Sequence, residues 1–422
     1  MMRRMAVFFS GILLILTPAV PQGHAGVVHV EKWGQDSTYC GSAKDPCATI
    51  GRAIENADPG NTVLVGPGIY GDINGDGDFE DSGEESSRCG LTDSVVCVNK
   101  ANLRLESTMG AVHTVIDGGG SIEAGVCLAG NRVSFGKKGR GFTVRYAKRG
   151  VVLEGDRITV QSIRAEDNTT DGFFGTQSSE EGHYVLIGNT AVRDLTGFYF
   201  RARRNTPYLV RFMENRGRDN TSYGVYLRLE NTVTVRNNVM SNNNGGFLLS
   251  VGGGSLVKNN LAVGNAGVGF SVTKRKSGSV SLIGNSAARN GSYGFHLTSI
   301  DKFLGNVSTD NDEGLYCRTV KMRIVNNSIT ENASYGITIH RNGPGTAGIV
   351  LQKNNIYGNG WDTGDNCGLR NNMTEAITVR KNFWGDRAGP GADPADDTCG
   401  DPVTETSPAR KPLKVKVKTA IF

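Results

Sequence analysis

A short pattern of glycine, apolar residue, any residue and apolar residue recurs from residue 125 onward, and it constrains the fold more than any other feature. Successive copies lie 20 to 27 residues apart. They begin at Gly125, Gly150, Gly197, Gly224, Gly246, Gly269, Gly294, Gly314 and Gly336, with a degenerate copy at Gly172. A repeat of this length indicates a solenoid, and the alternation of apolar residues makes each unit two or three short strands.

An asparagine precedes most copies of the repeat, usually by eight or nine residues. These asparagines are Asn189, Asn215, Asn238, Asn260, Asn285, Asn306 and Asn327. At a turn, an asparagine side chain can hydrogen-bond its own backbone and also the asparagine of the coil above. The pattern therefore predicts an all-β parallel β-helix, with coils of about 22 residues stacked about 4.8 Å apart.

The composition excludes several other classes of protein. Glycine provides 58 of the 422 residues but proline only 12, and glycine shows no three-residue period, which excludes collagen. Glycine and asparagine at this density disfavour a helical bundle. With 38% apolar residues and nearly balanced charge, 46 basic against 41 acidic, the chain can bury a core and is not disordered.

These motifs resemble the right-handed parallel β-helix repeat proteins of the pectin-lyase-like superfamily, over roughly residues 27–400. The segment 46–65 resembles the amphipathic helix that closes the N-terminal end of such proteins, with Ile50, Ala53, Ile54 and Ala57 on one face. Asn382-Phe-Trp-Gly followed by Gly389-Pro-Gly resembles their closing segment. The resemblance implies the fold but no single activity, because the superfamily contains lyases, hydrolases, epimerases and noncatalytic proteins.

We expect four segments along the chain. Residues 1–25 read as a signal peptide, 26–60 as an N-terminal cap, 61–400 as the β-helix with an acidic loop at 71–85, and 401–422 as a basic edge segment. In that last segment Lys414, Lys416 and Lys418 alternate with apolar residues, a pattern typical of a guarded edge strand. A secreted or periplasmic monomer follows from this organisation.

Charge and hydropathy limit the partners. Removal of Arg3 and Arg4 with the leader lowers the formal charge from +5 to +3, too little to indicate nucleic-acid binding. No later stretch is apolar enough to span a membrane. With six histidines, one of them in the leader, the sequence does not support a copper-handling role.

All eight cysteines follow the leader, and in an oxidising compartment disulfides are expected. We expect bridges between Cys40 and Cys47 and between Cys367 and Cys399. Three others, Cys89, Cys97 and Cys127, compete for one bridge. Cys317 takes an inward apolar position of its repeat and is expected to be a free thiol in the core.

The acidic loop carries oxygen ligands at alternate positions followed by glycine, which resembles the first half of an EF-hand calcium loop. The expected metal ligands are Asp72, Asn74, Asp76, Asp78 and Glu84. Glu84 falls one position late for the terminal ligand, so a solvated acidic turn remains the alternative. The expected cofactor is a structural Ca²⁺.

Outward positions of the repeats form two ladders of polar and aromatic residues. The positions between the two apolar residues are Tyr199, Tyr226, Leu248, Ser271, His296, Tyr316 and Thr338. The next outward positions are Arg201, Arg228, Ser250, Thr273, Thr298, Arg318 and His340. The tyrosines, arginines and histidines of both sets are the expected substrate-binding residues, because guanidinium groups hold carboxylates and aromatic rings cover sugars.

Three functions remain open from the sequence. The favoured one is a secreted protein that binds polysaccharide, expected to be acidic, without catalysis. The second is a lyase or epimerase acting on uronic-acid polymers, with His296, Arg318 and Arg228 as candidate catalytic residues. The third is an adhesin or structural scaffold. Neither ladder carries the Asp and Glu residues of a calcium-dependent lyase, which is why catalysis ranks second.

Overall fold

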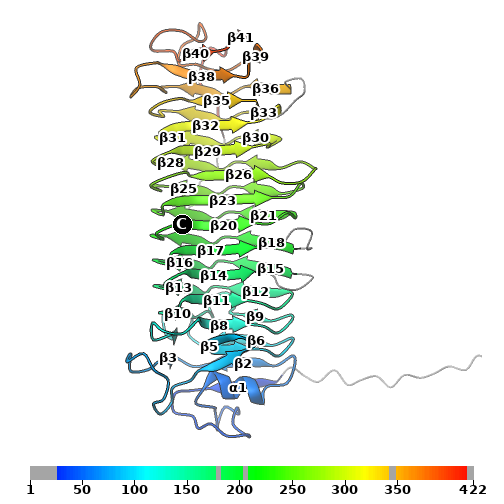
Figure 1. Ribbon diagram of the computed structural model, residues 1–422, viewed down its shortest axis with the longest axis vertical. Helices are drawn as coiled ribbons and strands as arrows, with labels where there is room; N and C mark the ends of the chain where they lie inside the picture. The colour runs from blue at the N-terminus through cyan, green and yellow to red at the C-terminus, as the bar shows by residue number, and fades with distance from the viewer. Residues whose placement is uncertain (1–25, 177–181, 203–207, 342–347, 416–422) are drawn as a thin grey trace, which may run out of the picture.

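The chain winds into a rod of stacked coils (Figure 1). A typical coil contributes one strand to each of three parallel sheets. The computed structural model describes residues 26–176, 182–202, 208–341 and 348–415. The expected leader at 1–25 therefore lies outside the described residues. Strands pair in parallel from coil to coil, whereas β4 (Ser87–Cys89) and β5 (Thr92–Val98) form an antiparallel hairpin. The predicted parallel β-helix is confirmed.

Three sheets form the sides of the rod. Sheet 1 contains β1 (Val27–Val30), β2 (Thr62–Val65), β6 (Arg104–Ser107), β9 (Ser134–Phe135), β12 (Ile158–Gln161), β15 (Gly182–Ile187), β18 (Tyr208–Met213), β21 (Val233–Arg236), β24 (Leu256–Lys258), β27 (Ser281–Ile283), β30 (Lys302–Leu304), β33 (Lys321–Val325), β36 (Gly348–Gln352), β39 (Ile377–Arg380) and β41 (Val403–Thr406). Sheet 2 contains β3 (Gly68–Gly71), β7 (Thr114–Asp117), β10 (Thr143–Arg145), β13 (Arg164–Glu166), β16 (Thr190–Val192), β19 (Arg216–Arg218), β22 (Val239–Ser241), β25 (Leu261–Val263), β28 (Ser286–Ala288), β31 (Val307–Thr309), β34 (Ser328–Thr330) and β37 (Asn355–Tyr357).

Sheet 3 carries the glycine repeats and runs up the side of the rod that faces the viewer in Figure 1. After β4 and β5 it contains β8 (Ala124–Leu128), β11 (Arg149–Leu153), β14 (Asp171–Thr176), β17 (Thr196–Arg201), β20 (Tyr223–Arg228), β23 (Gly245–Val251), β26 (Phe270–Lys274), β29 (Tyr293–Thr298), β32 (Glu313–Arg318), β35 (Ile337–His340), β38 (Cys367–Asn372) and β40 (Asp397–Gly400). Its inward side chains stack along the axis, as Phe247, Phe270 and Phe295 do with ring centroids 4.5 and 4.8 Å apart.

The repeat glycines are required by close approach of the backbone, not by a sharp left-handed corner, since none of them has a positive φ. A side chain at Gly197 would place its Cβ 2.6 Å from the carbonyl oxygen of Gly224 in the next coil. Gly246 meets the carbonyl of Gly269 in the same way, at 2.5 Å. Because a Cβ cannot approach an oxygen so closely, any larger residue would push two coils apart.

The predicted asparagine ladder exists, and a second one lies at the next turn. In the first, Nδ2 of Asn238 donates to Oδ1 of Asn260 at 2.8 Å and the pattern continues coil by coil. The left-handed backbone falls on the preceding residue, as at Asn237, and not on the ladder asparagine. The second ladder runs Asn168, Asp194, Asn220, Asn243, Asn265, Asn290, Asn311, Asn332, Asn359 and Asp396.

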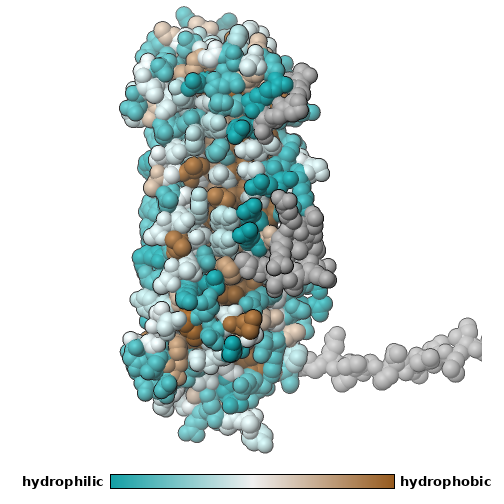
Figure 2. All heavy atoms as spheres, in the orientation of Figure 1, coloured by the Kyte–Doolittle hydropathy of each residue, from teal (hydrophilic) through white to brown (hydrophobic). Residues whose placement is uncertain are grey.

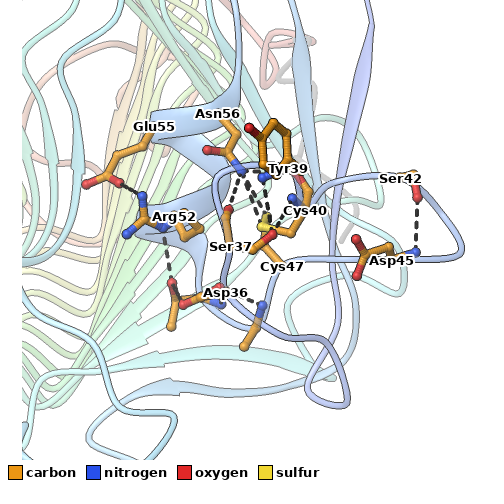
Figure 3. Close-up of a disulfide and its surroundings, with 12 residues drawn as sticks. Asp36, Ser37, Tyr39, Cys40, Ser42, Asp45, Cys47, Arg52, Glu55 and Asn56 are labelled. Atoms are coloured by element: carbon orange, nitrogen blue, oxygen red, sulfur yellow. Dashed lines mark hydrogen bonds and ion pairs between the residues drawn. A yellow bond between two sulfur atoms is a disulfide. The ribbon is translucent and has the colours of Figure 1, made fainter.

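Helix α1 (Ile50–Asn56) covers the N-terminal end of the core, with Ile50, Ala53 and Ile54 buried as predicted. Figure 3 shows the disulfide between Cys40 and Cys47 beside it, with Nδ2 of Asn56 donating to the carbonyl oxygen of Cys40 at 3.0 Å. These contacts fix the cap to the first coil.

The remaining cysteines follow the predictions and settle the open case. Cys367 bonds to Cys399, and Cys317 is a buried free thiol, as expected. Cys89 bonds to Cys97, which leaves Cys127 as a buried free thiol in register with Cys97.

The expected strand over 413–418 is not formed where the structure describes it. Leu413 lies outside any strand, and its backbone is paired with a side chain: its N–H donates to Oδ1 of Asn355 at 2.8 Å, and Asn355 Nδ2 donates to its carbonyl at 2.9 Å. Because this amide takes the place of a peptide partner, no ladder of backbone bonds develops. Residues 416–418 lie outside the described residues, and β41 is the last strand of sheet 1.

Candidate functional site

The outer face of sheet 3 gathers the predicted binding residues into two ladders. The first ladder is Phe174, Tyr199, Tyr226, Leu248, Ser271, His296, Tyr316, Thr338 and Arg370. The second ladder is Arg201, Arg228, Ser250, Thr273, Thr298, Arg318, His340 and Asn372. Figure 2 shows this face, where apolar side chains surface between hydrophilic ones along the rod.

Aromatic rings stack along the first ladder in the earlier coils. The ring centroids of Phe174 and Tyr199 are 5.6 Å apart, and those of Tyr199 and Tyr226 are 4.8 Å apart with 10° between the planes. The guanidinium of Arg149 lies 4.0 Å from the centroid of Phe174. These rings stack because parallel coils place identical positions directly above one another.

Two histidines and a tyrosine form a further group on this face, on β29, β32 and β35, which we call the second cluster. The ring of Tyr316 lies between two imidazoles, with centroids 5.0 Å from His296 and 4.9 Å from His340. Burial, reinforced by the charge of Arg318, lowers the pKa of His296 and also that of His340 below the ordinary histidine value. The neutral form of both imidazoles is therefore favoured, and His340 Nε2 lies 3.3 Å from Nδ2 of Asn372.

A third ladder, which the sequence analysis missed, occupies the position just before each repeat glycine. It brings Tyr293, Glu313 and Tyr335 beside the second cluster. Burial raises the pKa of Glu313 to about 7, and its Oε1 has no hydrogen-bond partner among the described residues. The outward face therefore does hold a carboxyl group, and the signal for it was a polar residue directly preceding the glycine.

The arginines of the second ladder are available to a ligand. Within the described ranges, Arg201, Arg228 and Arg318 form no ion pair with a carboxylate. All three are exposed at the end of their strands. A guanidinium on such a surface presents five N–H donors in a planar fork that matches a carboxylate or a sulfate.

In the acidic loop, the predicted calcium ligands hold the loop's own backbone. Asp72 accepts hydrogen bonds from the N–H groups of Gly75 at 2.6 Å and Gly77 at 2.9 Å. Asp76 and Asp78 each accept from the residue two positions on, Asn74 Nδ2 donates to Asp76, and Glu84 accepts from Ile73 N–H. Calcium binding by this loop stays a prediction.

The loop is anchored to the cap by a residue outside the predicted set. Glu85 accepts hydrogen bonds from the N–H groups of Ile50 at 3.0 Å and Gly51 at 2.7 Å at the start of α1. Burial raises the pKa of Glu85 to about 7. Order in the loop is thus coupled to order in the cap.

No described helix is long and apolar enough to cross a membrane. The family model for the periplasmic copper-binding protein NosD matches residues 114–300. No curated protein matches the chain. That family is described as periplasmic, which agrees with the predicted extracytoplasmic location.

The donors of the described chain do not fit a copper site. Among the described residues, the one group of three His, Cys, Asp or Glu side chains within mutual reach is Asp36, Cys40 and Cys47, whose two sulfurs form a disulfide. His296 and His340 are separated by the ring of Tyr316. The copper binding named in the family's description is therefore not carried over to this chain.

Three solved structures share the architecture. The A-module of the mannuronan C-5 epimerase AlgE4 from Azotobacter vinelandii is 18% identical, with a TM-score of 0.46 over 70% of this chain and 86% of that one. A rhamnogalacturonan lyase is 13% identical (TM-score 0.49, 77% and 84% covered), and pectate lyase Pel9A is 16% identical (0.42, 81% and 82%). At these identities the likeness concerns the fold alone. The coil-by-coil topology itself identifies the chain as a right-handed parallel β-helix repeat protein, similar in fold to the pectin-lyase-like superfamily.

Proposed function

We propose that this protein binds an acidic polysaccharide along the outer face of sheet 3. One observation carries the proposal: exposed arginines that pair with no carboxylate of the described residues stand in register beside a stack of aromatic rings. An acidic sugar chain needs both features, since its rings pack on aromatic faces and its charged groups pair with guanidinium forks.

The spacing of the coils supports a repeating ligand. Arg201 and Arg228 are Cα partners in adjacent strands, as are Tyr199 and Tyr226 beside them. Adjacent parallel strands lie about 4.8 Å apart, so these two coils offer the same pair of groups one coil apart. Tyr316 and Arg318 repeat the pair further along the face. A polymer that carries one charge per sugar unit would meet several such pairs at once, which raises its overall affinity.

The test is affinity electrophoresis in gels that contain polygalacturonate, alginate or neutral dextran. Tyr199→Ala and Tyr226→Ala should each weaken retardation in an acidic gel, because each removes a sugar-facing ring. Tyr39→Ala is the matched control. Tyr39 is 91% exposed and lies beside the cap disulfide at the N-terminal end of the rod, not on the outer face of sheet 3 (Figure 3). Wild-type protein that migrates alike in all gels would contradict the proposal.

A second candidate function, a lyase or epimerase on uronic-acid polymers, is favoured by the cluster around His296. A neutral imidazole beside Arg318 can take the proton next to a uronate carboxylate while the guanidinium stabilises the developing charge. In elimination the electron pair forms a C=C bond, the glycosidic C–O bond breaks, and the leaving oxygen receives a proton. Glu313 is a suitable proton donor because the raised pKa keeps part of it protonated at pH 7.

Absorbance at about 235 nm on incubation with polygalacturonate or alginate tests elimination, and proton exchange at C5 in deuterated water tests epimerisation. His296→Gln should abolish either signal and leave binding within about threefold of wild type. If wild-type protein binds but yields neither signal, the function is binding alone. A protein that does neither fits an adhesin or a structural scaffold instead.

A further inference from the structure

Between the stacked rings and the histidine cluster, the outer face of sheet 3 is hollowed. A cavity of about 250 Å³ opens over β20, β23 and β26. It is lined by Tyr226, Arg228, Leu248, Ser250, Ser271, Thr273 and Arg275, together with Leu249. The hollow exists because small side chains occupy these ladder positions: Ser250 follows Arg228 of the coil before, and Ser271 lies between Leu248 and His296 of the neighbouring coils.

Two guanidinium groups border this hollow. Arg275 follows the end of β26, and its Nε donates to Oγ of Ser250 at 2.5 Å. Ser250 is buried, at 4% exposure, so it holds the guanidinium at a fixed place and leaves its terminal nitrogens for another partner. Arg228 lies on β20, one coil before Ser250, and is the Cα partner of Ser250.

The charge around the hollow is unbalanced. Arg228 and Arg275 form no ion pair with any carboxylate of the described chain, and the lining contains no acidic residue. Two like charges at neighbouring positions repel each other unless an anion or water lies between them. A group that accepts hydrogen bonds from both forks would relieve this repulsion and use donors that are already oriented.

We propose that this hollow is a subsite for one anionic substituent, a carboxylate or a sulfate, of a sugar unit whose ring packs on Tyr226. The inference rests on the proposed function and sharpens it, since it assigns Arg275 and Ser250, neither of which the sequence analysis selected as binding residues. Arg228 and Arg275 contact the anion, whereas Ser250 is a positioning residue that acts through Arg275.

The test measures dissociation constants for polygalacturonate, which carries carboxylates, dextran sulfate, which carries sulfates, and neutral dextran. Arg275→Ala and Arg228→Ala should each weaken binding of the preferred acidic polymer about tenfold or more. Arg275→Lys keeps the charge but loses the fork, so it should recover only part of the affinity. Ser250→Ala should weaken binding severalfold, and Arg275→Ala should then cause little further loss in that background.

Arg236→Ala is the matched control, because Arg236 is an exposed arginine on β21 of sheet 1, outside this face. The polymer whose affinity responds to Arg275 identifies the anion as a carboxylate or a sulfate. If the Arg228, Arg275 and Arg236 variants all bind like wild type while Tyr226→Ala is weakened, the subsite is wrong and the proposed function stands. If wild-type protein binds neither acidic polymer, the proposed function itself fails, and the subsite with it.

Discussion

Arginines beside sheet 2 and arginines on sheet 3 of the same rod differ in whether they have carboxylate partners. Beside sheet 2, each of four arginines has a carboxylate partner: Arg145 with Asp117 at 2.7 Å, Arg164 with Glu166 at 2.6 Å, Arg193 with Asp167 at 2.6 Å and Arg218 with Asp219 at 3.0 Å. On sheet 3, Arg149 near the N-terminal end pairs with Glu123 and Asp171, whereas Arg201, Arg228 and Arg318 have no carboxylate partner among the described residues. Both sides are polar, so composition does not distinguish them.

The comparison teaches that a binding face is recognised by unsatisfied donors rather than by charge. On the sheet 2 side, carboxylates from the same or adjacent coils have neutralised the arginines. The half-exposed pairs Arg193–Asp167 and Arg218–Asp219 contribute little stability. On sheet 3 the neighbouring positions hold tyrosine, serine, threonine and histidine, which leave the guanidinium groups free for an external anion.

The largest effect should come from removing the unpaired arginines. The double variant Arg228→Ala/Arg318→Ala should lose about 100-fold or more in affinity for the preferred acidic polymer, because each charge-assisted hydrogen bond contributes about 1.5–3 kcal/mol. The matched double variant Arg193→Ala/Arg218→Ala should bind like wild type and change stability by less than about 1 kcal/mol. Equal losses in both double variants would show that only overall charge matters and would break the comparison.

The acidic loop is the converse of the sheet 3 face: here carboxylates, and not arginines, form no ion pair among the described residues. If Asp72, Asp76 and Asp78 wrap a calcium ion, binding stabilises this end by about 2.7 kcal/mol at a hundredfold excess over the dissociation constant. Chelator should then expose residues 70–90 to protease before the central coils unfold, since Glu85 ties the loop to α1. Asp76→Ala should abolish this dependence and His296→Ala should not. If chelator leaves the protease sensitivity of this segment unchanged, the loop is a solvated acidic turn and not a calcium site.

The turn between sheets 2 and 3 carries an asparagine in most coils, but a carboxyl group at Asp194 within the ladder and at Asp396 at its end. Asp194 Oδ1 accepts from both N and Nδ2 of Asn168, while its Oδ2 is buried without a partner among the described residues. Burial raises the pKa of Asp194 to about 7, so the folded protein holds this proton between about pH 4 and 7 whereas the unfolded chain does not. The stability that Asp194 contributes is therefore complete below about pH 4 and is lost as pH rises toward 7.

Asp194→Asn should restore the amide ladder and stabilise the fold at pH 8 by about 2 kcal/mol, with a smaller gain at pH 5. Urea unfolding at the two pH values measures the difference. The control is Asp219→Asn, which alters a half-exposed carboxylate, paired with Arg218, at the turn of the next coil. A gain that is the same at both pH values would contradict protonation of Asp194.

The smallest effect concerns the histidines of sheet 3. Because burial and Arg318 lower the pKa values of His296 and His340, these groups gain protons only below about pH 6.5, where uronate carboxylates are still ionised. Affinity for an acidic polymer should therefore rise a few-fold between pH 7 and pH 5. His296→Gln/His340→Gln should flatten this profile, and a flat wild-type profile would place the ligand away from the cluster.

The sequence by itself determined the architecture, because the stacking of a solenoid follows from residues that recur at a regular spacing along the chain. Each coil repeats the same glycine, apolar and asparagine positions, so the register that stacks Tyr199 on Tyr226 follows from the spacing of Gly197 and Gly224 alone. The same argument placed Cys317 in the core and both ladders on one face. The disulfide between Cys40 and Cys47 also followed from local spacing.

Only the tertiary structure decided which of these groups are free and which are satisfied. Whether an arginine is paired depends on a carboxylate one coil away, as for Arg193 and Asp167, which are 26 residues apart in sequence. The hollow beside Arg275 and the burial of Glu313 likewise arise from side-chain sizes in three successive coils. Coil-to-coil contacts vary with each coil's exact length and side chains, so the repeat predicts the ladder but not the partners that each rung finds.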